Sequence, residues 1–368
     1  MKRLLCIVSS MDTGGAETFL MKMYRALDKS KYQMDFCVSK TGANFYDDEI
    51  KRLGGKVFRI TPKSKNPLKS FMDVRKLVKE NSYEHVLRIG QSSLATTDLI
   101  AARLVGARCL ALRSSNSDTC GGFVSNVIHK LLSPLTKIVP NVKIAPSTEA
   151  ALHVFGKRNV RENKVTFLNN AICVDNFLMN EDIRQKMRNE LKIEDKFVVG
   201  HVGRFAEQKN HKFLIEIFAQ IKKKKSDSVL ILIGEGELQN GIKEKVDSLG
   251  LSDSVKFLGV RSDVSHVYMA MDAVLFPSFF EGMPNVLIEA QGSGLHCITS
   301  DTVTKEANIT GLVDYISLEK SAEYWADVVL GYANGYAREN YKAQFVRNGY
   351  DIESAAKCFS DTIFEYNK

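Results

Sequence analysis

Short apolar segments rich in β-branched residues recur along the chain, and longer segments with helical periodicity separate them. This alternation is typical of βαβ units built around a parallel sheet. In the first half of the chain the expected strands are Leu4–Val8, Met34–Val38, Lys56–Ile60, His85–Ile89, Cys109–Leu112, Lys143–Pro146 and Val165–Leu168.

The same alternation begins again after a polar, charged stretch from Asn180 to Asp195. With 368 residues the chain is longer than one hydrophobic core usually organises. We therefore predict an α/β protein with two doubly wound domains, at residues 1–180 and 181–350, facing each other across a cleft. The amphipathic segment 351–368 is expected to form a last helix that packs back on the first domain. The strands expected in the second domain are Phe197–Val202, Val229–Ile233, Val255–Leu258, Ala273–Phe276 and Cys297–Thr299.

Composition narrows the class of protein and its surroundings. The seven cysteines are scattered and form no C-x-x-C pair, which argues against a disulfide framework or a zinc knuckle and favours a reducing compartment. The apolar run Leu4–Val8 is too short for a signal peptide. No stretch approaches the roughly 18 to 20 apolar residues needed to cross a bilayer. We expect a cytoplasmic protein, and any membrane association is expected to be peripheral, on the inner face of the cell membrane.

Charge is distributed unequally between the two halves. Residues 1–170 carry 28 Lys and Arg against 14 Asp and Glu, whereas the remainder carries 23 against 29. An excess of this size predicts that the first half meets an anionic partner, such as a membrane surface, a lipid diphosphate or nucleic acid. Nucleic acid is the least favoured of these because no basic, aromatic-rich binding module is apparent. Dispersed solvated charge is the alternative interpretation.

A glycine pair follows the first expected strand. Gly14 and Gly15 come directly before a helical pattern that begins near Thr18. Glycines allow a ligand to approach the backbone, and the free amides of a helix N-terminus attract phosphate. The spacing is not that of a dinucleotide-binding loop, and a purely structural turn explains it equally well.

Two cations follow the first strand of the second domain. Gly203 and Arg204 end that strand, and Lys209 comes five residues after the arginine. A guanidinium and an ammonium at the carboxyl edge of a sheet suit a diphosphate whose charge grows as a glycosidic bond breaks. Solvated surface charge is the alternative. Gly234 and Val260 lie in turns after the next two strands, where main-chain groups could hold a planar base or simply form a turn.

The most specific pattern is a pair of glutamates around the start of a helix. Glu281 lies in a loop, Asn285 is expected to cap the helix, and Glu289 lies in its second turn. A carboxylate accepts strong, directional hydrogen bonds from hydroxyls, which is what recognition of a sugar requires. We expect Glu281 to contact the sugar and Glu289 to contact a ribose. Further candidates for binding the molecule that carries this sugar and ribose lie in the same loop and at the start of the helix: Gly282, Met283, Pro284 and Val286.

Taken in order, these motifs resemble the retaining glycosyltransferases of the GT-B fold, in particular the fourth family, which includes bacterial capsule, exopolysaccharide and lipopolysaccharide enzymes. The resemblance spans nearly the whole chain. It implies two Rossmann-like domains, with Arg204 and Lys209 on the donor diphosphate and Glu281 and Glu289 on the donor sugar and ribose. It also implies that Gly14 and Gly15 lie near the diphosphate and the acceptor.

The chain departs from the family pattern in its first domain. Many relatives carry a histidine after a first-domain strand, whereas this chain has Leu112-Arg113-Ser114-Ser115-Asn116. We take Glu17, Arg113, Ser115 and Asn116 as acceptor-side candidates. A second departure is His296, which stands where relatives usually have proline, and we interpret it as a local backbone feature.

The reaction expected from the resemblance is transfer of a sugar from a nucleotide diphosphate donor to a polyprenyl-diphosphate-linked glycan, with UDP expected from family frequency. No D-x-D motif is present, so we expect no metal or other cofactor, with Arg204 and Lys209 supplying the positive charge. Front-face attack, in which the departing phosphate accepts the acceptor proton, is the expected mechanism. A nucleotide-sugar epimerase and a non-catalytic nucleotide-sugar-binding protein are the alternatives.

One further segment, Phe123–Lys143, mixes apolar residues with four basic or histidine side chains and a proline. It could rest on an anionic bilayer and present the lipid-linked acceptor. An ordinary pair of core helices is the alternative.

Overall fold

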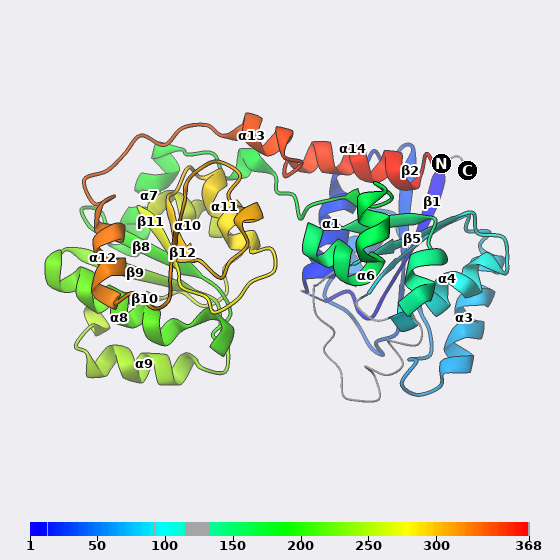
Figure 1. The fold of residues 1–368 in the computed structure, drawn as a ribbon, viewed down its shortest axis with the longest axis horizontal. Coiled ribbons are helices and arrows are strands. Elements are labelled where there is room, and N and C mark those ends of the chain that lie inside the picture. The colour runs from blue at the N-terminus through cyan, green and yellow to red at the C-terminus, as the bar shows by residue number, and fades with distance from the viewer. Residues whose placement is uncertain (13, 91–92, 115–132, 367–368) are drawn as a thin grey trace. The chain divides into compact units, whose positions relative to one another are not determined.

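The computed structural model describes residues 1–12, 14–90, 93–114 and 133–366, and it divides the chain into two compact units (Figure 1). Unit 1 comprises Met1–Ala171 and Ile352–Lys368, and unit 2 comprises Ile172–Asp351. The chain first passes from unit 1 to unit 2 after Ala171, nine residues earlier than the boundary expected after residue 180. No change in composition marks it, because residues 172–180 fold within unit 2, where Phe177 contacts Gly292.

Unit 1 contains a seven-stranded parallel sheet in the order β3-β2-β1-β4-β5-β6-β7. Each of the seven expected strands forms, so the predicted parallel sheet is confirmed. Its strands are β1 (Lys2–Val8), β2 (Tyr32–Val38), β3 (Val57–Arg59), β4 (His85–Ile89), β5 (Cys109–Arg113), β6 (Val142–Ala145) and β7 (Thr166–Phe167). Its helices within the described residues include α1 (Gly15–Ala26), α2 (Asp47–Arg52), α3 (Pro67–Glu80), α4 (Thr96–Arg103), α6 (Thr148–Arg161) and α14 (Ile352–Ile363).

Two helices of unit 1, α3 and α6, begin with ordinary side-chain caps. The side chain of Asn66 accepts a hydrogen bond from the amide of Lys69 at 2.9 Å, and Pro67 occupies the first position of α3, where no amide is needed. Ser147 caps α6 in the same way by accepting from Ala150. These local signals explain why the helices begin where they do.

The C-terminal helix α14 belongs to unit 1, on which it packs against α1. Phe359 meets Phe19 edge to face, with ring centroids 6.3 Å apart. Just beyond the helix, Phe364 stacks on Tyr32 at 4.6 Å, and Lys2 forms an ion pair with Glu365 at 2.6 Å. The last residues therefore complete the core of the unit that the first residues begin.

Unit 2 contains a six-stranded parallel sheet in the order β10-β9-β8-β11-β12-β13. Five of its strands agree with expectation, whereas β13 was not predicted. Its strands are β8 (Phe197–Val202), β9 (Ser228–Ile233), β10 (Val255–Phe257), β11 (Ala273–Phe276), β12 (Cys297–Ser300) and β13 (Val313–Ile316). Its helices are α7 (Glu181–Leu191), α8 (His211–Lys224), α9 (Gln239–Ser248), α10 (Val264–Ala270), α11 (Asn285–Gly292), α12 (Ala322–Leu330) and α13 (Lys342–Arg347).

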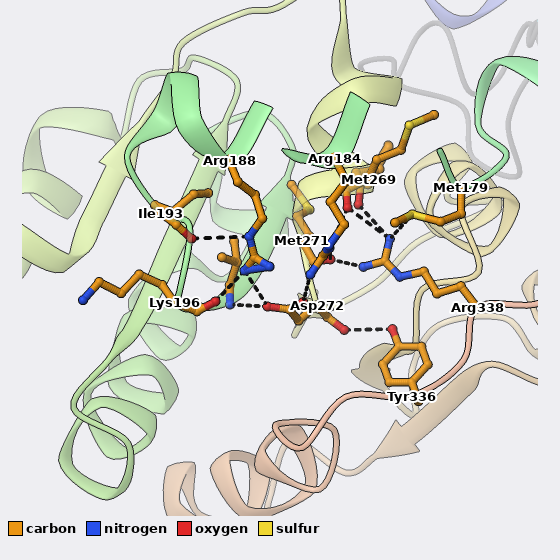
Figure 2. A network of polar contacts seen from close by, with 12 residues as sticks. Met179, Arg184, Arg188, Ile193, Lys196, Met269, Met271, Asp272, Tyr336 and Arg338 are labelled. Carbon is orange, nitrogen blue, oxygen red and sulfur yellow. Dashed lines mark hydrogen bonds and ion pairs between the residues drawn. The ribbon is translucent and has the colours of Figure 1, made fainter. Parts of the chain in front are cut away.

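The polar, charged stretch after which the alternation begins again contains helix α7. Asn180 caps it by accepting a hydrogen bond from the amide of Ile183 at 3.0 Å. Both arginines of the helix have partners within unit 2: Arg184 donates to Asp272 at 2.6 Å, and Arg188 donates to the other oxygen of Asp272 at 3.1 Å (Figure 2). The stretch is therefore part of unit 2, and its other charged residues, such as Glu181 and Lys186, are exposed.

Asp272 is the centre of a network that also holds the segment after α12 (Figure 2). Its carboxylate accepts a hydrogen bond from the amide of Val198, and its carbonyl accepts one from the hydroxyl of Tyr336. Arg338 donates to the carbonyls of Met269 and Met271, at the end of α10. Guanidinium groups thus satisfy the free carbonyls of a helix C-terminus.

His296, the departure noted in the sequence, has a structural role. Its ring stacks on Tyr332 at 4.0 Å and meets Tyr336 edge to face at 4.7 Å. Its backbone amide donates a hydrogen bond to the hydroxyl of Tyr336 at 3.1 Å. A proline could not make this bond, which is the physical reason for a residue with an amide hydrogen here.

Candidate functional site

The donor-side candidates of unit 2 lie in loops at the carboxyl ends of neighbouring strands. Loop 203–210 follows β8, the turns at Gly234 and Gly259 follow β9 and β10, and loop 277–284 follows β11. Since all these strands are parallel, the loops share one edge of the sheet. This is the edge at which open parallel sheets bind their ligands.

Two hydrogen bonds fasten loop 203–210 to loop 277–284. The amide of Phe279 donates to the carbonyl of Gln208 at 2.9 Å, and the side-chain amide of Gln208 donates to the carbonyl of Phe280, also at 2.9 Å. These bonds set the separation of the residues that come next in each loop, Lys209 and Glu281. Gln208 was not singled out from the sequence, where a glutamine in a polar loop carries no distinguishing signal.

Lys209 and Glu281 form a nearly buried ion pair. The ammonium Nζ lies 2.6 Å from carboxylate Oε1, and the side chains are 15% and 9% exposed. The same ammonium lies over the ring of Phe276, 4.7 Å from its centroid. One cation and one carboxylate are thus held side by side in a place largely screened from water, where charge interactions are strong.

Two histidines lie behind Lys209. His201 and His211 are buried, and their rings meet at 4.7 Å, while Phe205 stacks on His211 at 4.2 Å. Burial lowers the pKa of His211 to about 4, and burial also holds the pKa of His201 well below its usual value. Both imidazoles are therefore neutral, and neither competes with Lys209 as a cation. The sequence alone gave no indication that His201 and His211 are in contact.

Glycines allow the backbone segments after β8, β9 and β10 to approach one another closely and to form hydrogen bonds. The amide of Gly203 donates to the carbonyl of Ile233, and the amide of Gly234 donates to the carbonyl of Gly259. Gly234 has φ +129°, and a Cβ placed there would lie 2.2 Å from the carbonyl oxygen of Gly203. Only glycine fits this position, so the backbone itself forms this part of the edge.

Arg204 and Val260 remain open to solvent. The Arg204 side chain is 71% exposed, and its contact with Glu237 is long, at 3.9 Å. Val260 is 73% exposed although it is apolar. An exposed guanidinium and an exposed apolar side chain at this edge are suited to an anion and to the face of a base, respectively.

Helix α11 begins one residue differently from expectation. Asn285 is its first residue, Pro284 occupies the cap position, and no side chain caps the helix. The predicted capping role of Asn285 is therefore wrong, because proline already fixes the entry of the chain. Instead, Oδ1 of Asn285 is buried without a hydrogen-bond partner among the described residues.

Glu289 lies on α11 beside Tyr268. Burial, with smaller contributions that include Glu289, raises the pKa of Tyr268 well above its usual value. The Tyr268 hydroxyl also donates weakly to the carbonyl of Val286, at 3.4 Å. Tyr268 was not anticipated, since it occurs in an apolar stretch typical of a core helix.

The loop before α11 rests on a small apolar cluster. Ile288 of α11 packs in this cluster with Ile172, Val174, Phe345 and Tyr350. The Tyr350 hydroxyl lies 3.5 Å from the sulfur of Met283, whereas Gly282 next to it is exposed. Residues near the start and near the end of unit 2 therefore support loop 277–284 by packing against it and against α11.

In unit 1 the glycine pair begins α1, as expected. Gly14 is the cap residue and Gly15 the first helical residue. The carboxylate of Glu17 folds back over Gly14, because a Cβ on Gly14 would lie 2.2 Å from Oε2 of Glu17. Burial raises the pKa of Glu17. An acid at the first turn of a helix is favoured by the free amides there.

Arg113 ends β5 and is buried, with 2% exposure. Its guanidinium lies over the ring of Phe19 at 3.6 Å and donates to Asn170 at 2.9 Å. Burial lowers its pKa to about 9, which still leaves it charged at neutral pH. Ser115 and Asn116, the other acceptor-side candidates, lie outside the described residues, as do residues 123–132 of the segment considered for the membrane.

A cavity of about 510 Å³ opens at the opposite, amino edge of the unit 2 sheet. The network of Figure 2 lines it, with Arg184, Arg188 and Arg338 among its residues. Their guanidinium groups already donate to carbonyls and to Asp272. The arginines of this cavity are thus engaged within the fold, and the candidate site remains the carboxyl edge, where the predicted residues lie.

Within the described ranges, the structure brings together no group of three His, Cys, Asp or Glu side chains that could hold a metal ion. None of the described helices is both long enough and apolar enough to cross a membrane.

The chain resembles known proteins along almost all its length. The family described as glycosyl transferases group 1 matches residues 182–344. EpsF of Bacillus subtilis, which is named as a glycosyltransferase, is 33% identical over 359 residues, covering 96% of this chain and 94% of EpsF. A UDP-Gal:α-D-GlcNAc-diphosphoundecaprenol α-1,3-galactosyltransferase of Escherichia coli is 25% identical and covers 78% of this chain and 76% of its own.

Solved structures have the same fold. A glycosyltransferase from Rickettsia africae superposes with a TM-score of 0.78 at 16% identity, covering 98% of both chains. Anabaena HepE, crystallised with UDP-glucose, superposes with a TM-score of 0.67 at 20% identity, covering 99% of this chain and 96% of HepE. The two-domain α/β fold expected from the sequence is confirmed.

Proposed function

The chain belongs to the group 1 glycosyltransferases, and on that premise we propose that it transfers a hexose or N-acetylhexosamine from a nucleotide diphosphate sugar to a lipid-linked glycan in bacterial surface polysaccharide synthesis. UDP is the proposed nucleotide. We propose retention of anomeric configuration and no requirement for metal. The comparisons show the glycosyltransferase family that the motifs around Glu281 and Glu289 resemble.

The ion pair of Lys209 and Glu281 is the observation that carries the proposal. It holds an ammonium and a carboxylate 2.6 Å apart at the carboxyl edge of unit 2. We propose that the ammonium binds the donor phosphate and that the carboxylate accepts hydrogen bonds from sugar hydroxyls. An arriving diphosphate would bind the ammonium and release the carboxylate for the sugar. Both groups would then act on the donor that separates them.

Arg204 is proposed to supply the second positive charge. Its exposed guanidinium has no close carboxylate among the described residues, its contact with Glu237 being 3.9 Å. Charge on the departing nucleotide diphosphate increases as the glycosidic bond breaks, so two preorganised cations stabilise the transition state more than the bound donor. The departing phosphate oxygen is proposed to accept the proton of the attacking hydroxyl on the same face.

The nucleotide and the acceptor are proposed from relatives. The Escherichia coli relative is named for UDP-galactose and for a diphosphoundecaprenol-linked sugar, and a Campylobacter jejuni relative is also named for a diphospho-undecaprenol acceptor. HepE was crystallised with UDP-glucose. A polyprenyl-diphosphate glycan at the inner face of the cell membrane would suit the basic first half of this chain.

Nucleotide release tests the proposal. Purified protein is mixed with a panel of UDP-, GDP- and ADP-sugars in EDTA, with and without a polyprenyl-diphosphate-sugar extract. We expect acceptor-dependent release from one donor, unaffected by EDTA, and a product whose anomeric proton shows retained configuration. Glu281→Gln and Lys209→Met should each lower turnover about a hundredfold or more.

The controls are exposed residues of the same types in the same unit, Glu244→Gln and Lys212→Met, which should turn over as the wild type does. Conversion of the donor sugar without acceptor would indicate an epimerase instead. Donor binding without turnover in every mixture would indicate a non-catalytic binding protein.

A further inference from the structure

Helix α3 presents a face that the fold does not use. Its buried residues Val74, Leu77 and Val78 pack into the core of unit 1. On the other side, Leu68 is 73% exposed and Met72 is 48% exposed. Residues four apart lie on one face of a helix, so the two apolar side chains form one continuous strip on its outer surface.

Basic side chains surround this strip. The exposed residues of the same face are, besides Leu68 and Met72, mainly Lys65, Lys69, Arg75, Lys76 and Lys79. Of the helix's acids, Asp73 accepts a hydrogen bond from the amide of Thr61, and Glu80 lies 3.8 Å from Lys76. The outer face therefore has a clear positive excess. We name Lys65, Leu68, Lys69, Met72, Arg75, Lys76 and Lys79 the α3 face.

The α3 face begins at the edge of unit 1 where its strands end. Helix α3 follows β3, so its first turn, with Leu68, lies at the carboxyl edge of the sheet, as do Gly14 and Gly15 after β1.

We infer that the α3 face is the surface by which this enzyme rests on an anionic bilayer. Leu68 and Met72 enter the headgroup region, while the lysines keep their ammonium groups at the level of the lipid phosphates. This inference rests on the proposed lipid-linked acceptor, because it brings the carboxyl edge of unit 1 to the membrane that holds such an acceptor.

Charge and size favour a bilayer over a protein partner. Unit 1 as a whole carries 30 Lys and Arg against 17 Asp and Glu, so its field complements anionic lipid. Two exposed apolar side chains are few for a stable protein interface, which needs about 800 Å² on each partner. Shallow insertion of a few apolar side chains combined with several lysines is, in contrast, typical of peripheral membrane binding.

Vesicle flotation tests this inference on the full chain. The probes are phosphatidylcholine vesicles with and without phosphatidylglycerol. We expect wild-type protein to float only with phosphatidylglycerol and to be released by high salt. Leu68→Ser with Met72→Ser should weaken binding about tenfold or more, and Lys69→Gln should weaken it about fivefold. Leu249→Ser, at a residue 46% exposed in unit 2, is the matched control and should bind as the wild type does.

Wild-type protein that does not float with anionic vesicles, or variants that float as well as the wild type, would overturn the inference. Saturable binding of an acidic protein to the α3 face without vesicle binding would do the same. Turnover separates this failure from failure of the proposed function. Measured with a short-chain, water-soluble acceptor, turnover should be unchanged in Leu68→Ser with Met72→Ser, whereas turnover of a full-length acceptor in vesicles should fall with binding. A wild-type protein that is inactive on both acceptors would contradict the proposed transferase function. Flotation would in that case still test whether the α3 face binds the membrane.

Discussion

Nζ of Lys209 lies 2.6 Å from Oε1 of Glu281, and both side chains are almost fully removed from water. Two charges in such a place depend on each other, because loss of either leaves the other buried and unpaired. The pair therefore contributes to stability and to the proposed chemistry through the same atoms, and the two contributions can be separated.

Single and double substitutions separate them. Lys209→Met and Glu281→Gln should each lower the free energy of unfolding by about 3 kcal/mol. The double variant should be more stable than the sum of the two losses predicts, because it leaves no unpaired charge, and yet it should remain inactive. Chemical denaturation of the four proteins gives the coupling free energy. Additive losses in stability would contradict the interpretation of these residues as a coupled buried pair.

Substitution of Gly234 tests whether its close backbone approach to Gly203 is needed for stability and for donor binding. Gly234→Ala places a methyl group 2.2 Å from the carbonyl of Gly203 and forces a positive φ on alanine. We expect a loss in unfolding free energy of about 2 kcal/mol and a raised KM for the donor. Gly241→Ala on α9 is the control, since a Cβ there meets nothing within 4 Å and should stabilise the helix by up to about 1 kcal/mol. A Gly234→Ala variant with wild-type stability and KM would show that the close approach is not needed.

The pH dependence of stability should reflect His211. Its folded pKa of about 4 lies below the ordinary value of 6.5, so between these values the unfolded chain binds more protons. The stability that comes from the neutral imidazole is complete above about pH 6.5 and is lost as the pH falls toward 4. At about 1.4 kcal/mol per pH unit, the loss reaches roughly 3 kcal/mol.

His211→Phe should remove most of this loss, since phenylalanine keeps the stack on Phe205 and cannot take up a proton. The measurement is urea denaturation of both proteins from pH 7 to about pH 4.5, within the range where the imidazole of the unfolded chain titrates. The difference between the two proteins isolates the histidine. His201, whose pKa is also lowered, remains in the variant and leaves part of the acid sensitivity. Parallel curves for wild type and variant would reject the assignment.

Asp272 should affect stability alone. Asp272→Asn removes the charge that Arg184 and Arg188 share, which leaves two partly buried guanidinium groups without a carboxylate. We expect a loss of about 3 kcal/mol in thermal or chemical denaturation. Turnover per folded molecule should be unchanged at a temperature well below the transition, because Asp272 precedes β11 and thus lies at the amino edge of the sheet. A selective loss of turnover would show that this edge takes part in the reaction.

The strands were the most predictable part of the fold. β4, β8 and β11 have the bounds expected, because apolar residues predominate in each and a polar residue, glycine or proline borders it on either side. β13 was missed since Asp314 and Tyr315 interrupt its apolar pattern. It lies at the edge of the sheet, where a strand can expose such residues.

Charge was harder to interpret than hydrophobicity. The charges of α7 give no local indication of their partners, and only the structure shows Arg184 directed to the carbonyls of Met269 and Met271. These partners are more than eighty residues away, so no local pattern identifies them. The boundary between the units after Ala171 was unpredictable for a similar reason. It depends on the long-range contacts of the residues that follow Ala171.

The candidate site was predictable in its residue types and not in its contacts. Lys209 and Glu281 were both chosen from the sequence, but their ion pair depends on Gln208, which fastens the two loops together. The neutral histidines behind Lys209 likewise follow from packing that brings His201 of β8 onto His211 of α8. Long-range packing of this kind leaves no periodic signal in the chain.

The division of the chain also has a consequence for its synthesis. Unit 2 is one continuous segment, whereas unit 1 needs α14, whose Phe359 and Ile363 belong to its core. A nascent chain emerging from the ribosome has all of unit 2 before it has the last helix of unit 1. The part of the protein that is translated first is therefore the part whose core is completed last.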